Sequence, residues 1–383
     1  MTHSSVIEIS EKALKNNLKF IRHVVGDGCR ISCVLKGNAY GHGIDVYAPL
    51  LNECGIDHIS VFNAEEAYRV FKSTDRKSEI MIMGMIDDSA MNWVVENDIS
   101  FFVFNLDRLK KALTASKMVG RPARIHIELE TGLNRTGFVR KELKSVIRLI
   151  SGCPENFIVE GVCTHYAGAE SIANYKRIQR QIRMFKSESK WLKDQQLDYK
   201  LRHSACSAAA MSYPTTRMDM VRIGIMQYGY WPSKETYISY LNRRPEKGDP
   251  LQRVISWKTQ VMTTKSVRAG EFIGYGTTYM AESDMRIAIV PVGYSEGYSR
   301  SLSNQGRVLI RGNRVNVVGL VNMNMLVADI TNVPDAGIGD EVVLIGNQGD
   351  QDVSVASFSE LSNQLNYELL TRLPQNIRRV VTE

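Results

Sequence analysis

The sequence predicts an α/β protein that begins with a (β/α)8 barrel and continues into a mostly-β C-terminal domain. Eight short apolar or alternating runs are separated by helical patterns, as expected for parallel barrel strands and their connecting helices. The count of eight strands is complete near residue 230, close to the usual barrel length of about 250 residues. Beyond residues 231–250 strand patterns follow one another without helices. We therefore expect the barrel in residues 1–245 and the mostly-β domain in residues 246–383.

The individual elements follow from hydrophobic periodicity and turn residues. Ser10 is a predicted N-cap, because the following helical pattern places Leu14, Leu18 and Ile21 on one face. Helices are also expected at 44–53, 64–73, 106–117, 141–150 and 173–194. The expected barrel strands are 31–35, 58–62, 80–83, 100–104, 124–129, 158–164, 200–204 and 220–226. The expected strands of the second domain are 252–262, 270–275, 285–292, 307–321, 325–330 and 341–346, with turns at Arg-Ala-Gly, Arg-Gly-Asn and Ile-Gly-Asp and a short helix at 356–365.

Composition and charge exclude several classes of protein. A hydrophobic fraction of 44% and a charged fraction of 23% are those of a folded domain rather than a disordered chain. The net charge of +7 is dispersed along the chain without a basic stripe, so we expect no nucleic-acid partner. The six cysteines lack C-x-x-C spacing, so neither a disulfide framework nor a metal site is expected. With no leader-like segment and no run of about 18 apolar residues, we expect a cytoplasmic protein that binds no membrane.

One lysine stands where an apolar run ends. Cys33, Val34 and Leu35 lead directly into Lys36, and Gly-Asn-Ala-Tyr-Gly-His-Gly follows. Burial disfavours the charged form of an amine, so a lysine at the end of a buried strand can become a nucleophile or a base near neutral pH. A lone lysine of this kind is more often one that reaches out to solvent. The string after Lys36 resembles the pyridoxal-phosphate lysine motif of the alanine racemase family, and this resemblance favours the reactive interpretation, an imine with that cofactor.

The other unusual polar residues also follow expected strands. In a (β/α)8 barrel the active site occupies the carboxyl ends of the strands, and a phosphate is often held after strands seven and eight. Ser207 opens a short expected helix at that place, and Gly224 would let the backbone approach a ligand closely. The residues that fall on this face are Lys36, Glu128, Glu130, Arg135, His165, Ser207, Arg222, Gly224 and Ile225.

Seven groups of residues resemble, in the same order, the signatures of the alanine racemase family. They are Leu35–Gly43, Glu130–Phe138, Thr164–Ala167, Val221–Gly224 with Tyr228-Gly229, Tyr275–Tyr279, Gly293–Tyr298 and Tyr367–Leu370. The resemblance spans the chain from Val34 to about Arg379. It implies a pyridoxal-phosphate-dependent racemase that interconverts L- and D-alanine. It also implies a homodimer whose active sites lie at the subunit interface.

The resemblance implies that two residues act as catalytic bases. Lys36 would hold the cofactor covalently and act on one face of the substrate Cα. Tyr275, from the β domain of the other subunit, would act on the opposite face. Racemisation requires such a pair, because one face loses a proton and the other gains one. A tyrosine is a poor base at its usual pKa of about 10, and Arg222 acting through His165 is the expected source of the positive charge that lowers it.

The resemblance also assigns the binding residues. Arg222 would bond the pyridine nitrogen, and since a guanidinium cannot accept a proton, that nitrogen would stay unprotonated. The ring would then be a weaker electron sink, which suppresses side reactions such as transamination. The remaining assignments are Tyr40, Ser207, Gly224 and Ile225 on the phosphate, His165 against the ring, Arg135 and the Met323 backbone amide on the substrate carboxylate, and Tyr294 at the substrate entry.

Four positions depart from the family pattern. The usual Asn-Ser before the short helix is Cys206-Ser207, and the usual Asp after Met323 is Asn324. Glu128 stands where the family often has a lysine that it can carry as a carbamate, and Gln375 replaces a late aromatic residue. These changes do not affect the expected type of reaction. They leave the identity of the substrate open, with serine or another amino acid as alternatives to alanine.

Other protein classes remain as rival interpretations. Another pyridoxal-phosphate barrel enzyme, such as an amino-acid decarboxylase or a D-amino-acid lyase, would share Lys36 but not the pair of bases. A small pyridoxal-phosphate carrier would lack the residues after the barrel that include Tyr275. A catalytically inactive homologue would not need to keep both Lys36 and Tyr275. The sequence therefore favours a racemase over these alternatives.

Overall fold

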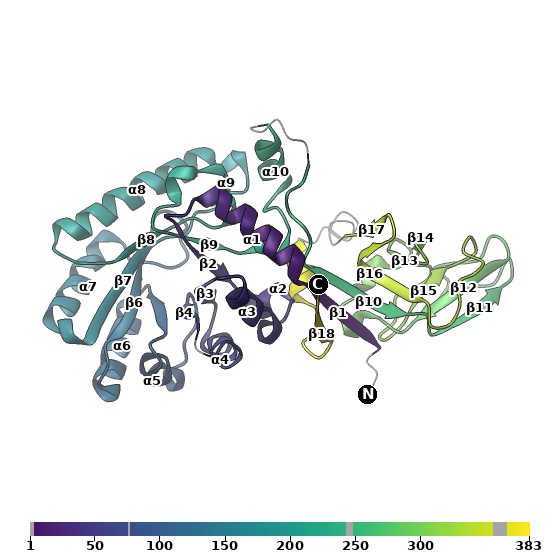
Figure 1. Cartoon of the computed structure of the whole chain (residues 1–383), viewed down its shortest axis with the longest axis horizontal. Coiled ribbons are helices and arrows are strands. Elements are labelled where there is room, and N and C mark those ends of the chain that lie inside the picture. The colour runs from purple at the N-terminus through teal and green to yellow at the C-terminus, as the bar shows by residue number, and fades with distance from the viewer. Residues whose placement is uncertain (1–3, 76, 243–247, 355–365) are drawn as a thin grey trace. The chain divides into compact units, whose positions relative to one another are not determined.

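The computed structural model describes residues 4–75, 77–242, 248–354 and 366–383 (Figure 1). The chain divides into two compact units. The unit called here the barrel unit consists of Ala13–Lys36 and Tyr47–Gln252, and the β unit consists of Met1–Lys12, Gly37–Val46 and Arg253–Glu383. The glycine-rich turn after Lys36 therefore belongs with the β unit. The domain boundary near residue 245 stays a prediction.

The barrel unit contains eight parallel strands, which confirms the expected fold class. Most positions of these strands are apolar and buried, as parallel strands covered on both faces require. Side by side the order is β8-β7-β6-β5-β4-β3-β2-β9. The ends of this order meet where Arg222 N donates to Ala205 O (2.9 Å) and Asp219 N donates to Arg202 O (3.2 Å). The strands are β2 (Arg30–Val34), β3 (His58–Val61), β4 (Glu79–Ile82), β5 (Ser100–Val103), β6 (Ala123–Glu128), β7 (Phe157–Cys163), β8 (Leu201–His203) and β9 (Met220–Ile223).

Helices connect these strands and surround the barrel (Figure 1). The five helices expected between the strands are confirmed, two of them with N-caps: Asn63 Oδ1 accepts from Glu66 N and Asn105 Oδ1 accepts from Arg108 N. The expected helix after Ser10 is confirmed as α1. Helix α10 lies in a segment where none was expected. The helices of the described residues are α1 (Glu11–Val25), α2 (Lys36–Tyr40), α3 (Ile44–Glu53), α4 (Ala64–Ser73), α5 (Asp88–Glu96), α6 (Leu106–Val119), α7 (Arg140–Gly152), α8 (Tyr175–Asp194), α9 (Ser207–Ser212), α10 (Lys234–Leu241) and α12 (Asn366–Thr371). Of these, α12 and most of α2 belong to the β unit, and α2 has left-handed backbone angles.

The β unit contains two sheets. The larger sheet has the order β14-β13-β16-β10-β1-β18, with β17 also paired to β16, and the smaller has the order β11-β12-β15. Trp257 and Tyr298 lie fully buried in this unit. The strands are β1 (Ser5–Ser10), β10 (Ile255–Gln260), β11 (Thr263–Val267), β12 (Met285–Val290), β13 (Arg307–Ile310), β14 (Asn313–Asn316), β15 (Leu326–Asp329), β16 (Glu341–Gln348), β17 (Gln351–Val353) and β18 (Arg378–Thr382).

The β unit differs from the expected secondary structure at two strands, and one expected helix cannot be compared. The strand expected at 270–275 is wrong, since the segment makes only an isolated bridge between Phe272 and Met280. The strand expected at 307–321 is two strands, because Arg311 and Gly312 both have positive φ (51° and 76°) and form the hairpin turn between β13 and β14. The helix expected at 356–365 lies outside the described residues.

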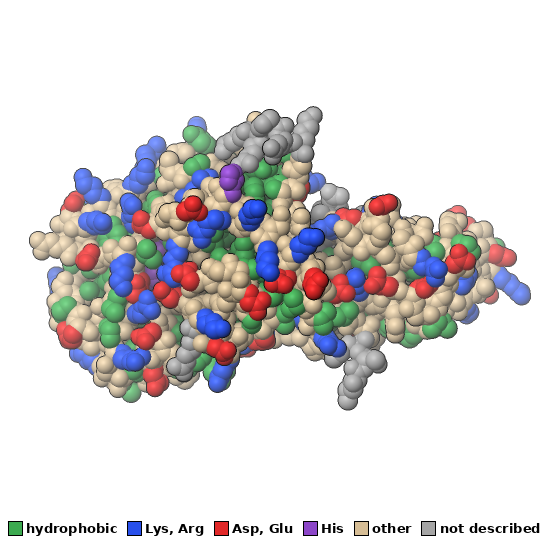
Figure 2. Space-filling view, in the orientation of Figure 1, with side chains coloured by type: hydrophobic (Ala, Val, Ile, Leu, Met, Phe, Trp, Pro, Cys, Tyr) green, Lys and Arg blue, Asp and Glu red, His purple; other side chains and the backbone are tan. Residues whose placement is uncertain are grey.

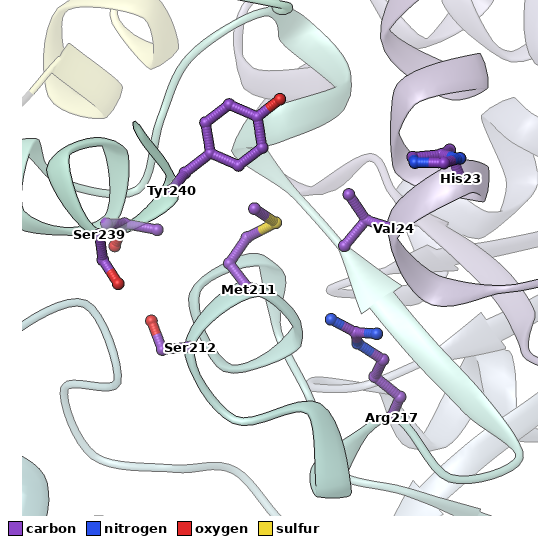
Figure 3. A pocket seen from close by; sticks show the side chains of 8 residues that line it. His23, Val24, Met211, Ser212, Arg217, Ser239 and Tyr240 are labelled. Carbon is purple, nitrogen blue, oxygen red and sulfur yellow. The ribbon is translucent and has the colours of Figure 1, made fainter. Parts of the chain in front are cut away.

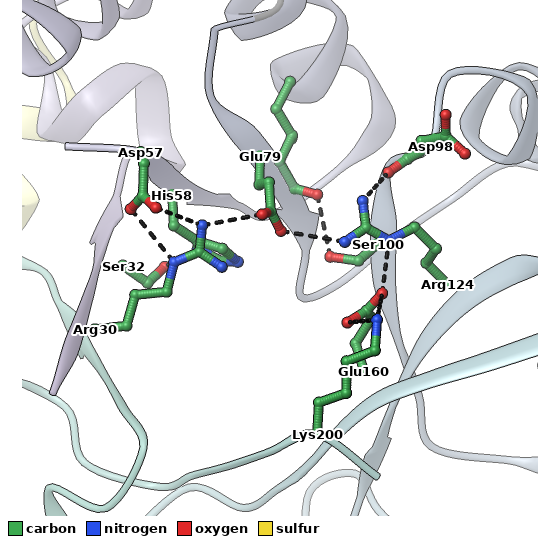
Figure 4. A network of polar contacts seen from close by, with 11 residues as sticks. Arg30, Ser32, Asp57, His58, Glu79, Asp98, Ser100, Arg124, Glu160 and Lys200 are labelled. Carbon is green, nitrogen blue, oxygen red and sulfur yellow. Dashed lines mark hydrogen bonds and ion pairs between the residues drawn. The ribbon is translucent and has the colours of Figure 1, made fainter. Parts of the chain in front are cut away.

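A chain of ion pairs crosses the amino ends of the barrel strands (Figure 4). Arg30 pairs with Asp57 (2.7 Å) and Glu79 (3.1 Å). Glu79 also pairs with Arg124 (3.2 Å), which in turn reaches Glu160 (2.7 Å). These charges alternate along β2, β4, β6 and β7, so each strand is tied to another at the end opposite the expected active site.

Charges of both signs are interspersed on the face of the molecule that Figure 2 shows. No basic stripe stands out on that face. Within the described part of the chain, no helix combines the length and the apolarity that crossing a membrane requires.

Candidate active site

The carboxyl ends of the barrel strands bring together most of the expected site residues. Lys36 follows β2, His165 follows β7, Ser207 follows β8, and Arg222 lies in β9 just before Gly224. Arg135 and Ile225 complete the group, all within the barrel unit.

Lys36 has a lowered pKa. Its side chain is exposed at the barrel rim in the single chain, but the surrounding barrel atoms partly enclose the amine and disfavour its charged form. The positive charge of Arg135 lowers the pKa further, and that of Arg222 adds a smaller effect. A larger fraction of this amine is therefore neutral, and available as a nucleophile or base, than for an ordinary lysine.

Ser207 and Gly224 form a small polar cradle. Ser207 is the first residue of α9, as expected, and its buried Oγ accepts a hydrogen bond from Gly224 N (3.0 Å). The 3-10 helix η4 (Ile225–Tyr228) begins directly after Gly224. A serine hydroxyl can donate to a phosphate, and the glycine beside it lets the backbone approach that group closely.

Arg222 is buried and held by several acceptors. Its Nη2 donates to Thr164 O (2.7 Å), and its Nη1 donates to His203 O (3.0 Å) and lies 2.6 Å from His203 Nδ1. His203 Nε2 lies 2.9 Å from His126 Nδ1. The sequence analysis missed both histidines, and the only signal for them is a histidine inside an otherwise apolar or alternating strand.

His165 is neutral at physiological pH. Burial, followed by the charges of Arg222, Arg135 and Lys36, lowers its pKa to about 3. A neutral imidazole can stack on a ring or pass a hydrogen bond, but it brings no positive charge of its own. Any effect of charge on a nearby tyrosine must therefore come from the arginines rather than from His165.

Glu128 is a buried carboxyl at the end of β6. Burial raises its pKa, although a hydrogen bond from Thr136 and the charges of Arg222 and Arg135 act in the opposite direction. Its neighbours therefore include the arginine expected to bind the substrate carboxylate. Glu130, two residues further on, accepts from the backbone N–H groups of Gly132 and Asn134 and thereby shapes the loop that carries Arg135.

The remaining expected site residues lie in the β unit. Tyr275 is 72% exposed and is flanked by two glycines with positive φ, Gly274 (77°) and Gly276 (69°). The loops of Tyr294 and Met323 contact each other, since Tyr294 N donates to Asn322 O (3.0 Å) and Ser295 N donates to Met323 O (3.0 Å). All three side chains are exposed within the single chain.

Tyr40 lies in a left-handed turn of the backbone. Gly37, Asn38, Ala39 and Tyr40 have φ between 50° and 63°, and Gly41 N donates to Gly37 O (3.0 Å), which makes one turn of left-handed helix. Each L-residue in this conformation costs roughly 1–2 kcal/mol, so the surroundings must stabilise the turn.

The turn also has internal hydrogen bonds. Asn38 Oδ1 accepts from Ile44 N (3.1 Å), and Gly43 N donates to Asn38 O (2.9 Å). His42 Nδ1 lies 3.0 Å from the carbonyl oxygens of Ala39 and Tyr40. Because both neighbours are acceptors, Nδ1 carries the proton.

A separate hollow of about 190 Å³ lies between α1, α9 and α10 (Figure 3). Met211 lies in the middle of the group of side chains in this view. Arg217 lines the hollow just before β9 begins, at the amino ends of the strands. This hollow is therefore not part of the candidate active site.

The barrel-mouth residues fit pyridoxal phosphate, which has an aldehyde and a phosphate. A lysine with a lowered pKa beside Arg135 suits the aldehyde, and the Ser207–Gly224 cradle suits the phosphate. Among the described residues, no group of three or more His, Cys, Asp or Glu side chains is arranged to hold a metal ion. The fold and the site together define a barrel enzyme that acts at the carboxyl ends of its strands.

Comparisons with known proteins identify the family. Residues 9–232 match the family described as "Alanine racemase, N-terminal domain", and residues 254–381 match "Alanine racemase, C-terminal domain". The alanine racemase of Leptospira interrogans is 34% identical over 382 residues, which cover 100% of this chain and 97% of that protein. The chain belongs to the alanine racemase family, and it is an amino-acid racemase, an isomerase.

Solved structures show the same fold. The alanine racemase of D-cycloserine-producing Streptomyces lavendulae has a TM-score of 0.91 and 26% identity, covering 100% of this chain and 98% of that one. The alanine racemase of Bartonella henselae, solved with covalently bound pyridoxal phosphate, has a TM-score of 0.83 at 23% identity and full coverage of both chains. Both structural matches agree with the expected barrel followed by a β domain.

Proposed function

We propose that this protein interconverts L- and D-alanine with pyridoxal 5'-phosphate as its cofactor, and that it also accepts serine. The observation that carries the proposal is the lowered pKa of Lys36 at a barrel mouth beside Arg135, Arg222 and the Ser207–Gly224 cradle. Membership of the alanine racemase family supports alanine as the substrate. The departures at Gln375, Asn324 and Cys206 support a second, hydroxylated substrate.

The bound cofactor would act as an electron sink that makes the proton on the substrate Cα removable. Lys36 would hold its aldehyde carbon, and Arg222 would donate to its ring nitrogen. The proposed cofactor-binding residues are Lys36, Tyr40, His165, Ser207, Arg222, Gly224 and Ile225. The anchored guanidinium of Arg222 supports its role, since it is fixed before the cofactor arrives.

Two bases would move the protons. The neutral Nζ of Lys36 would take or give a proton on one face of Cα, and the phenol oxygen of Tyr275 would do so on the other. Arg135 and the Met323 backbone amide would hold the substrate carboxylate, and Tyr294 would line the entry. These side chains would orient the Cα–H bond toward one base at a time.

We propose that the protein acts as a homodimer in which Tyr275 serves the neighbouring subunit's site. The exposure of Tyr275 in the single chain supports this, as do the large exposed apolar side chains Phe272, Met280 and Met323 of the same unit. We also propose a cytoplasmic location. All six cysteines are free, as is usual for proteins of a reducing compartment.

Borohydride labelling tests the cofactor assignment. Reduction of the purified protein should fix the pyridoxyl group to the peptide containing Lys36, and label on a different lysine would rule out this role. Incubation with L- or D-alanine in deuterated water should then yield both enantiomers with deuterium at Cα. Formation of an amine or a keto acid as the main product would indicate a decarboxylase or a lyase.

Hybrid dimers test the sharing of sites. Lys36→Ala and Tyr275→Phe proteins should each be nearly inactive. After subunit exchange, one site of the hybrid would contain both bases, so part of the activity should return. If each site used the tyrosine of its own chain, every hybrid site would lack one base and the mixture would stay inactive.

A further inference from the structure

The side chain of Arg379 joins two separate segments of the β unit. Its Nη2 donates to Gly41 O (2.9 Å), at the end of the left-handed turn. Its Nη1 donates to Pro374 O (2.7 Å), Gln375 O (2.9 Å) and Ile377 O (2.6 Å), in the segment between α12 and β18. One guanidinium therefore links residues that are more than 330 positions apart in the chain.

Close backbone packing between the same two segments supports this link. A Cβ atom on Gly41 would lie 1.9 Å from Leu370 O, and one on Gly43 would lie 3.2 Å from Cδ of Arg379. A Cβ atom on Gly37 would lie 3.1 Å from the Thr371 side chain. The turn is thus packed against residues 370–379 along its whole length.

The geometry requires an arginine rather than a lysine. The guanidinium is planar and presents its donors in fixed, diverging directions, so Nη1 and Nη2 can serve two segments at once. A lysine ammonium donates from a single atom and cannot reproduce that span. Without the guanidinium, the carbonyl of Gly41 in the strained turn would lose its hydrogen bond to Arg379, and so would three carbonyls of the segment between α12 and β18.

We propose that Arg379 is a positioning residue that sets both cofactor affinity and side-chain selectivity. The inference rests on the proposed function, in which Tyr40 helps to hold the phosphate and Gln375 stands beside the substrate side chain. Arg379 touches neither ligand. It fixes the turn that contains Tyr40 and the segment that contains Gln375 to each other, so movement of one segment displaces the other.

The test compares Arg379→Gln and Arg379→Lys with Arg378→Gln. Arg378 is the exposed neighbour on the same strand and controls for loss of a charge. Hydrogen exchange of cofactor-free protein reports the turn directly, through the amides of Gly41, His42 and Gly43, which donate inside it. We expect exchange at these amides to be faster in both Arg379 variants and unchanged in Arg378→Gln.

Titration with pyridoxal phosphate gives the second readout. Losing charge-assisted hydrogen bonds to the turn should raise the cofactor dissociation constant about tenfold in Arg379→Gln, with Arg379→Lys in between. The ratio of kcat/KM for serine to that for alanine should change in the same variants. Added guanidinium ions should partly restore cofactor binding in Arg379→Gly.

Two results would overturn the inference. One is unchanged exchange at the turn in Arg379→Gln, which would mean that Arg379 does not hold it. The other is faster exchange with cofactor affinity and selectivity equal to those of Arg378→Gln, which would make Arg379 merely structural. If the wild type itself binds no pyridoxal phosphate, the proposed function fails, while the exchange measurement still decides whether Arg379 holds the turn.

Discussion

Nη1 of Arg222 lies 2.6 Å from Nδ1 of His203 inside the barrel. A guanidinium only donates hydrogen bonds, so Nδ1 accepts and the imidazole proton is on Nε2. His203 Nε2 then donates to His126 Nδ1 at 2.9 Å. Burial and the charge of Arg222 lower the pKa of His203 well below its usual value, and burial does the same for His126. The two neutral rings therefore have fixed tautomers and hold Arg222 in one orientation.

Replacing His203 by phenylalanine should impair the chemical step more than substrate binding. The variant keeps a ring but removes the acceptor, and a hydrogen bond to a charged group is worth about 1.5–3 kcal/mol. We expect kcat to fall about tenfold or more, while KM changes little. Steady-state kinetics in both directions measure this. His58→Gln is the matched control, because His58 is also buried in the barrel but bonds Ser32 instead of Arg222; an equal loss in both variants would contradict the special role of His203.

Gly41→Ala should strongly destabilise the turn after Lys36. Gly41 has φ of 82°, and an added Cβ would also lie only 1.9 Å from Leu370 O. Gly55 has nearly the same φ (77°) but no atom within 4 Å of its would-be Cβ. Gly55→Ala should therefore lower the free energy of unfolding only by the backbone strain of about 1–2 kcal/mol. Gly41→Ala should lower it by more and should also weaken cofactor binding. Thermal unfolding compares the two, and equal losses would show that contact with Leu370 is unimportant.

The sequence predicted the barrel well because its signals are local. The apolar runs and the helical faces between them located all eight barrel strands to within a few residues. Strands β1, β11, β17 and β18 were missed. Strand β1 pairs with β10 and β18, which come from distant parts of the chain, so this pairing has no local signal. The site shows the same contrast between local and distant signals. Lys36 and Ser207 could be predicted because local sequence motifs mark them. The contact between His203 and His126 depends on two strands 77 positions apart, and it could not be read from either strand alone.

Glu79→Gln should weaken the ion-pair chain at the amino ends of the strands. Burial alone would raise the pKa of Glu79, but its hydrogen bond with Arg30 and the charges of Arg30 and Arg124 outweigh that effect and lower it. A lowered carboxyl pKa stabilises the fold above the unfolded-state value of about 4.3, and this stabilisation is lost as the pH falls through the folded-state value. Because Glu79 is 45% exposed, we expect a loss of only about 1 kcal/mol at neutral pH, smaller in high salt.

Thermal unfolding at pH 7 and pH 3, each at low and high salt, measures the effect of Glu79→Gln. The difference in unfolding temperature between Glu79→Gln and wild type should be smaller at pH 3, where the carboxyl is protonated in the unfolded chain. Asp107→Asn is the control, since its ion pair with Lys111 is highly exposed. A loss that is the same at both pH values would mean that the charge of Glu79 is not what stabilises the barrel.

Glu128→Gln should have opposite effects on function and stability. The raised pKa of this carboxyl means that its ionised form costs folding free energy, so stability falls as the pH rises from the unfolded-state value through the folded-state one. The glutamine variant should therefore unfold at a higher temperature than wild type above that window. Yet the ionised form can orient Arg135, so the variant should raise KM for alanine more than it lowers kcat.

The pH dependence of KM separates these roles of Glu128. In wild type KM should rise as Glu128 becomes protonated, and in Glu128→Gln this rise should be absent. Wild-type activity should also be indifferent to added bicarbonate, because a carboxylate already supplies the negative charge. An unchanged KM in the variant would mean that Glu128 has only a structural role.

Gln375→Tyr tests the basis of substrate choice. The family pattern has an aromatic residue here, so Gln375 should leave more room and offer an amide beside the substrate side chain. A hydroxyl can use that amide and a methyl group cannot, and one such contact is worth about 1–3 kcal/mol in discrimination. We expect the variant to lower kcat/KM for serine relative to alanine by about tenfold, with a long basic amino acid as a poor substrate throughout. If the serine-to-alanine ratio does not move, selectivity depends on other positions, and Asn324 and Cys206 are the next to exchange.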